Sequence, residues 1–189
     1  MPEGTKFIDT PGIRKASYGN SESDYTYYKT RRKAWMNEVI RLQLEDMEHN
    51  MFKEDIEVDD YDNPVLIKFP NFKLPKETRR LNPGVYTVPV IIALPDQYPF
   101  LPPVGFYLPS SIDAGEHGNL SRGFHGAFGS TSAEASIMND MDYSWYCSSI
   151  IANTWEPAYF KKVSDWRYGD NLWHVVSLIS EVLSDFSDD

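Results

Sequence analysis

The stretch that decides the fold reads GVYTVPVIIALPDQYPFLPPVGFYLP and runs from Gly84 to Pro109. Its first half is rich in valine and isoleucine, and its apolar residues alternate with the period of a β-strand. This is the clearest strand pattern in the chain. The side chains that the alternation places on one face are those of Tyr86, Val88, Val90 and Ile92.

A corner dense in proline follows this strand, with Pro99, Pro102 and Pro103 close together in QYPFLPP. Proline fixes the backbone angle φ and cannot continue a helix, so prolines at this density exclude a helix here. We therefore expect a rigid bend between adjacent strands. The bend leads into a short strand over Val104 to Leu108.

Patterns on either side of this stretch predict two helices and one more strand. Residues 31–52 (RRKAWMNEVIRLQLEDMEHNMF) repeat apolar side chains at helical spacing. Residues 63–75 (NPVLIKFPNFKLP) have the composition of a strand, and the charged segment 76–84 (KETRRLNPG) is expected to be a turn. Residues 171–186 (NLWHVVSLISEVLSDF) predict an amphipathic helix, for which Asp170 is a good N-cap. Its apolar positions are Leu172, Val175, Val176, Ile179 and Leu183.

The order of these elements indicates one α+β domain. A helix comes first, an antiparallel sheet of about four strands follows, and an irregular segment precedes the last helix. Residues 1–28 are polar without a sustained period, so we expect a partly ordered arm before a domain at 29–189. Within that domain, residues 110–136 are rich in glycine, serine and alanine and are expected to be an inserted loop.

Composition excludes several classes of function. The formal net charge of −10 disfavours a nucleic-acid partner, because the chain as a whole repels phosphates. No apolar run is long enough to span a membrane, and a single cysteine cannot form an internal disulfide, which favours a cytoplasmic protein. The four histidines lack metal-ligand spacing, and no phosphate-binding glycine loop is present, so neither a metal nor a cofactor is expected.

The single cysteine, Cys147, lies in the segment YSWYCSSIIANTWEP, eight residues before Trp155. A lone cysteine is more often a small buried side chain than a nucleophile. A thiolate is nevertheless both a good nucleophile and a good leaving group, which are the two properties that an acyl carrier needs. The surrounding motifs decide between these two interpretations.

Three motifs together resemble the ubiquitin-conjugating enzyme family: YPFLPP at 98–103, Cys147, and WEPA at 155–158. The resemblance covers roughly residues 33–185 and implies that family's α+β fold. It also implies an activity: Cys147 would accept the C-terminus of a ubiquitin-like protein from an activating enzyme as a thioester, and a target amine would then receive it.

The chain departs from the family pattern before and after the cysteine. The family's His-Pro-Asn tripeptide, whose asparagine assists acyl transfer, is missing, and Ser149 replaces an acidic residue two positions after the cysteine. Asn139 has the family's spacing, eight residues before the cysteine, while the segment HGNL offers His117 and Asn119 instead. An amide from either asparagine could stabilise the oxyanion of the transfer step. This divergence suggests a remote member, such as a bacterial relative from an operon for ubiquitin-like conjugation in antiphage defence.

The resemblance also implies partner surfaces. The positions that match ligase contacts are Phe100, Pro157 and Ala158, and Trp155 adds a partner role to a packing role. The positions that match the face for the activating enzyme are Arg31, Arg32 and Lys33, at the start of the first helix. The implied partners are a ubiquitin-like protein, an activating enzyme and a ligase or target protein.

Two other functions stay open at this point. A non-catalytic variant of the same fold would bind a ubiquitin-like protein or a partner through its surface, and the missing tripeptide favours this function. The cysteine at the family's spacing favours the enzyme. A cysteine-dependent hydrolase that uses one of the distant histidines is a third function.

Overall fold

The computed structural model describes residues 37–52, 56–59, 65–103, 105–115, 120–122, 142–148, 155–157 and 167–184. For 120–122 and 147–148 the description covers the backbone alone. The arm expected at 1–28 lies outside the described residues. No helix in the described part of the chain is long and apolar enough to cross a membrane.

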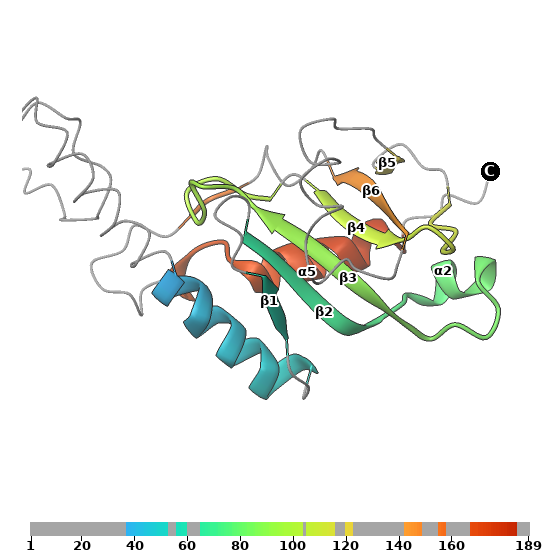
Figure 1. Ribbon diagram of the computed structural model, residues 1–189, viewed down its shortest axis with the longest axis horizontal. Coiled ribbons are helices and arrows are strands. Elements are labelled where there is room, and N and C mark those ends of the chain that lie inside the picture. Colours follow the sequence, from blue (N-terminus) through green and yellow to red (C-terminus); the bar gives the residue numbers. More distant parts are fainter. Residues whose placement is uncertain are drawn as a thin grey trace, which may run out of the picture.

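The centre of the fold is an antiparallel sheet of six strands in the order β1-β2-β3-β4-β6-β5 (Figure 1). Its strands are β1 Glu57–Asp59, β2 Val65–Lys73, β3 Thr87–Leu94, β4 Gly105–Pro109, β5 Leu120–Arg122 and β6 Tyr143–Ser148. The α+β class is confirmed, but the sheet is larger than the four or so strands that the sequence predicts. Strands β1 and β5 have three residues each, which is too short for a periodic signal. Strand β5 also lies inside the segment expected to be an inserted loop.

Two helices cover one face of this sheet. Residues 37–47 are α-helical and continue as the π-helical turn η1, Glu48–Phe52, and α5, Leu172–Val182, crosses behind the strands in Figure 1. A large core forms between these two helices and the sheet. Its members include Ile40, Leu44 and Met47 from the first helix, Phe69, Val88, Val90, Ile92, Phe106 and Tyr146 from the sheet, and Leu172, Val175, Val176, Ile179 and Leu183 from the C-terminal segment. The predicted apolar positions of the last helix are therefore confirmed.

The opposite face of the sheet carries a second buried cluster, made by Leu66, Ile91, Ala93, Tyr107 and Trp145. Strands β2, β3, β4 and β6 thus contribute buried side chains to both faces. This explains why the sequence of β3 becomes a nearly continuous apolar run in its second half, because a strand buried on both faces no longer alternates.

Three local predictions are wrong. The segment 76–84 is not simply a turn, because Lys76–Leu81 form the short helix α2. The N-cap of α5 is Asn171, whose side chain accepts a hydrogen bond from the backbone N–H of Trp173, and not Asp170. Tyr86, expected on one strand face with Val88, Val90 and Ile92, lies before the strand and is 66% exposed, because β3 begins at Thr87.

Candidate functional site

The proline-dense corner is a compact turn between β3 and β4, as the sequence predicts. The peptide bond between Tyr98 and Pro99 is cis. The backbone N–H of Tyr98 donates to the carbonyl of Pro95 at 2.8 Å, and that of Phe100 donates to the carbonyl of Gln97 at 2.8 Å. Two consecutive turns of this kind fix the course of the backbone through the corner.

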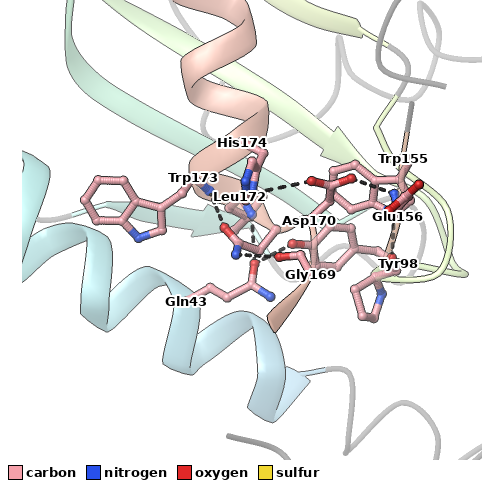
Figure 2. A network of polar contacts seen from close by, with 11 residues as sticks. Gln43, Tyr98, Trp155, Glu156, Gly169, Asp170, Leu172, Trp173 and His174 are labelled. Carbon is pink, nitrogen blue, oxygen red and sulfur yellow. Dashed lines mark hydrogen bonds and ion pairs between the residues drawn. The ribbon is translucent and has the colours of Figure 1, made fainter. Parts of the chain in front are cut away.

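Tyr98 fastens the corner to both helices. Its ring is completely buried, and its hydroxyl donates to Oε1 of Gln43 on the first helix. The same oxygen accepts the backbone N–H of Leu172, at the start of α5, at 3.0 Å (Figure 2). Burial raises the pKa of the Tyr98 phenol well above its ordinary value, so the hydroxyl stays protonated and keeps donating.

Burial of Tyr98 predicts a loss of stability in alkaline solution. The pKa of this phenol is higher in the folded chain than in the unfolded chain. The phenol therefore contributes fully to stability below its unfolded pKa of about 10. This contribution is lost as the pH rises from there toward the folded pKa. In this range the free energy of unfolding should fall by about 1.4 kcal/mol per pH unit. Tyr98→Phe should remove this slope, at a cost of about 1 kcal/mol near neutral pH for the lost hydrogen bond.

Urea unfolding of both proteins across the alkaline range measures this difference. The pKa of Tyr143 is also raised, chiefly by burial, but that residue is present in both proteins and cancels. Tyr86→Phe, which alters an exposed tyrosine, is the matched control and should keep the wild-type slope. Equal slopes for wild type and Tyr98→Phe would contradict the prediction.

Trp155 joins the segment after the cysteine to the corner. Its indole Nε1 donates to the carbonyl of Pro99 at 2.8 Å, and its ring centroid lies 6.2 Å from that of Tyr98 (Figure 2). The hydrogen bond bridges 56 positions of sequence. The fold therefore brings Trp155, the first residue of the WEPA motif, against Pro99 of the YPFLPP motif.

The next two residues are fastened to the start of α5. The backbone N–H of Glu156 donates to Oδ2 of Asp170 at 2.5 Å, and the N–H of Asp170 donates back to the carbonyl of Glu156 at 2.9 Å. Pro157 forms an isolated parallel bridge with Asp170. Asp170, which the sequence suggests as a helix cap, thus holds Glu156 and Pro157 beside the start of α5.

Cys147 lies within β6, in the interior of the sheet. Its Cα partners are Gly105 on β4 and Ser121 on β5. The sequence predicts an irregular segment between the sheet and the last helix. This prediction is wrong at Cys147, which lies in a strand. The backbone geometry is instead set by strands on both sides, and Gly105 stands only two residues beyond Pro103, the last residue of the corner motif.

Gly105 is the residue that lets β6 lie against β4. A Cβ atom at this position would meet the carbonyl oxygen of Tyr146 and, at 2.6 Å, the ring atom Cζ2 of Trp145. The ring of Trp145 therefore packs directly over the backbone of β4. The sequence signal for this contact is a glycine inside an otherwise apolar strand, which often marks a close approach.

The remaining site predictions divide into two groups. Phe100, Trp155 and Pro157 are described and partly buried, and they lie on the two segments that the Trp155 hydrogen bond joins. The others lie outside the described residues: Arg31, Arg32, Lys33, His117, Asn119, Asn139 and Ala158.

Gln43 is the functional-site neighbour that sequence reasoning missed. It is completely buried, and its one oxygen connects the corner with α5. The available signal was a polar side chain among apolar ones in VIRLQLEDM, where a glutamine must find partners when it is buried.

The described residues hold no group of three or more histidine, cysteine, aspartate or glutamate side chains placed to bind a metal ion. Comparisons of the chain with protein-family models, with curated proteins and with solved structures found no match.

Proposed function

We propose that this protein is a conjugating enzyme for a ubiquitin-like protein and that it works through a thioester on Cys147. The observation that carries the proposal is the 2.8 Å hydrogen bond from Trp155 to Pro99. It joins the two motif segments that resemble ubiquitin-conjugating enzymes. Cys147 belongs to the same assembly, because it is the register partner of Gly105 at the end of the corner.

The proposed reaction has two acyl-transfer steps. The thiolate of Cys147 attacks the carbonyl carbon of the thioester that an activating enzyme holds, and the thiolate of that enzyme leaves. The nitrogen of a target amine then attacks the new thioester, loses a proton and releases the Cys147 thiolate. No electrons are exchanged with an oxidant or reductant. The activating enzyme spends ATP to form the first thioester.

The proposed roles of the other residues follow from the resemblance. An amide of Asn139 or Asn119 would donate to the oxyanion of the second step, with His117 as a further candidate. Arg31, Arg32 and Lys33 would meet the activating enzyme.

The structure adds support for a shared ligase surface. Phe100 follows Pro99 directly, and Pro157 stands two residues beyond Trp155, so the Trp155–Pro99 hydrogen bond places both residues at the same corner. Leu101, next to Phe100, is 47% exposed. We propose that these residues and Ala158 form one apolar contact for a ligase or a target.

One observation favours a second function, a non-catalytic binding module. The chain lacks the His-Pro-Asn tripeptide whose asparagine assists acyl transfer in the family that it resembles. In the second function the same fold would hold a ubiquitin-like protein without carrying it.

A gel assay separates these functions. The full chain is mixed with its cognate activating enzyme, ubiquitin-like protein and ATP, and the products are compared with and without reductant. A conjugating enzyme gives an adduct that reductant destroys and that Cys147→Ala does not form. No adduct, in a mixture where the activating enzyme carries its own thioester, would reject the carrier function and favour the binding module. A hydrolase would instead cleave an isopeptide substrate without the activating enzyme.

A further inference from the structure

The connection between β2 and β3 forms a charged tip at one end of the sheet, where α2 stands beyond the ends of both strands (Figure 1). We call it the basic tip. It consists of Lys73, Lys76, Glu77, Arg79, Arg80, Leu81 and Tyr86.

The inner side of the tip is fixed to the body of the protein. Thr78, which is completely buried, donates its hydroxyl to the carbonyl of Leu183 at the end of α5. Asn82 donates its side-chain amide to the carbonyl of Asp113 at 2.7 Å and accepts the backbone N–H of Asp113 at 2.9 Å. With these contacts on the inner side, Lys76 and Arg80 stay exposed, and their spacing of four places them on one face of the helix.

The cations of the tip differ from the other cations whose side chains are described. Arg41 is paired with Glu38 and Glu45, Lys68 with Glu57, and Arg167 with Asp46. Lys73, Lys76, Arg79 and Arg80 form no ion pair in the described part of the chain. Arg79 and Arg80 lie in the last turn of α2, where the helix dipole favours cations. The like charges at this spacing still repel one another, and an external anion would relieve that repulsion.

Apolar surface accompanies the unpaired charge. The guanidinium of Arg79 lies 5.8 Å from the ring centroid of Tyr86, and its Nε is buried with no hydrogen-bond partner. Tyr86 is 66% exposed and Leu81 is 43% exposed. A ligand for this surface therefore needs both carboxylates and an apolar side chain.

We propose that the basic tip is a docking site for a short acidic peptide segment of a partner protein, with an aromatic or aliphatic residue between its carboxylates. Charge complementarity selects this occupant. The tip carries four cations and one carboxylate, Glu77, on a chain whose net charge is −10. A nucleic acid or an anionic membrane extends past the tip and meets the repulsion of the acidic remainder, whereas a short peptide contacts the tip alone.

Fluorescence anisotropy with a labelled synthetic peptide, GDEFDEFDEG, tests the proposal on the full chain. The uncharged peptide GNQFNQFNQG is the ligand control. We expect saturable binding of the acidic peptide that weakens as salt is added. Lys76→Gln/Arg80→Gln should weaken it at least about fivefold, and Tyr86→Ser should weaken it at least about threefold by removing the aromatic surface.

The matched control is Arg41→Gln/Arg167→Gln, which removes the same charge from two exposed arginines outside the tip and should leave the peptide affinity within about twofold. Circular dichroism verifies that each variant is folded. Equal weakening by both double variants, or a Kd above about 1 mM for the wild type, would overturn the proposal.

Three further results would assign the tip to another occupant and also overturn the proposal. The first is tighter binding of a single-stranded DNA oligonucleotide than of the peptide. The second is tighter binding of phosphatidylglycerol vesicles. The third is a wild-type dimer in light scattering that the tip variant converts to a monomer.

Discussion

Cys147→Ser is expected to replace a reductant-sensitive adduct with one that reductant leaves intact. A serine hydroxyl that accepts the ubiquitin-like C-terminus forms an oxygen ester, which thiols do not exchange but hydroxylamine cleaves. The ester should also form more slowly, because the hydroxyl is far less acidic than a thiol, whose ordinary pKa is about 8.5. The chain has no other cysteine, so every thioester it forms must be on Cys147.

Gel electrophoresis with and without reductant, followed by hydroxylamine treatment, measures this conversion. Cys147→Ala should form no adduct of either kind. Ser149→Ala, two residues away, is the matched control and should keep the wild-type thioester. An adduct that forms on Cys147→Ala at the wild-type rate would show that another residue is the acceptor, and the proposed function would then be wrong.

Gly105→Ala is expected to be the most destabilising small substitution in the described sheet. The added methyl group would meet the carbonyl oxygen of Tyr146, a backbone atom that cannot rotate away, and the ring of Trp145 at 2.6 Å. Strand β4 would have to separate from β6. We expect a loss of about 3 kcal/mol in the free energy of unfolding, which is a large share of a stability of about 5–15 kcal/mol.

Urea unfolding followed by tryptophan fluorescence measures this loss, and Gly84→Ala is its control. Gly84 has a φ of +86° with no atom within 4 Å of its added Cβ, so its substitution adds backbone strain of about 1 kcal/mol without a clash. Both substitutions stiffen the unfolded chain equally. A loss for Gly105→Ala no larger than that for Gly84→Ala would contradict the packing argument.

Gly105→Ala also connects stability with the proposed chemistry. Gly105 is the register partner of Cys147, so strain between β4 and β6 displaces the cysteine backbone. Under conditions where the variant is still folded, adduct formation should be slower than in the wild type, and the Gly84→Ala protein should react normally.

The sequence predicted a helix or strand correctly where that element is buried along its whole length. The last helix has a strict apolar period because Leu172, Val175, Val176 and Ile179 all face one core, and the strand at Val88–Ile92 is apolar because it is covered on both faces. The same reasoning failed at Tyr86, since alternation assigns a face but does not say where the covering layer ends.

Short and polar features could not be predicted in this way. Strands β1 and β5 have too few residues for a period, and β6 becomes a strand because β4 and β5 supply its hydrogen-bond partners. The role of Asp170 was also misassigned, because Asp170 and Asn171 both suit an N-cap. Only the position of Glu156 beside the helix shows which of them caps it and which binds the neighbouring segment.

The amino-acid order by itself determined the α+β class, the bend at the prolines, and the two motif segments with a single thiol between them. Folding decided that Trp155 reaches Pro99, that Gln43 joins the corner to α5, and that Arg79 lies over the ring of Tyr86 at the basic tip. The physical reason is the distance along the sequence over which each effect acts. Periodicity and proline act over a few neighbouring residues, whereas these contacts join positions that become neighbours only when a buried hydrogen bond or a packed ring offsets the entropy of bringing them together.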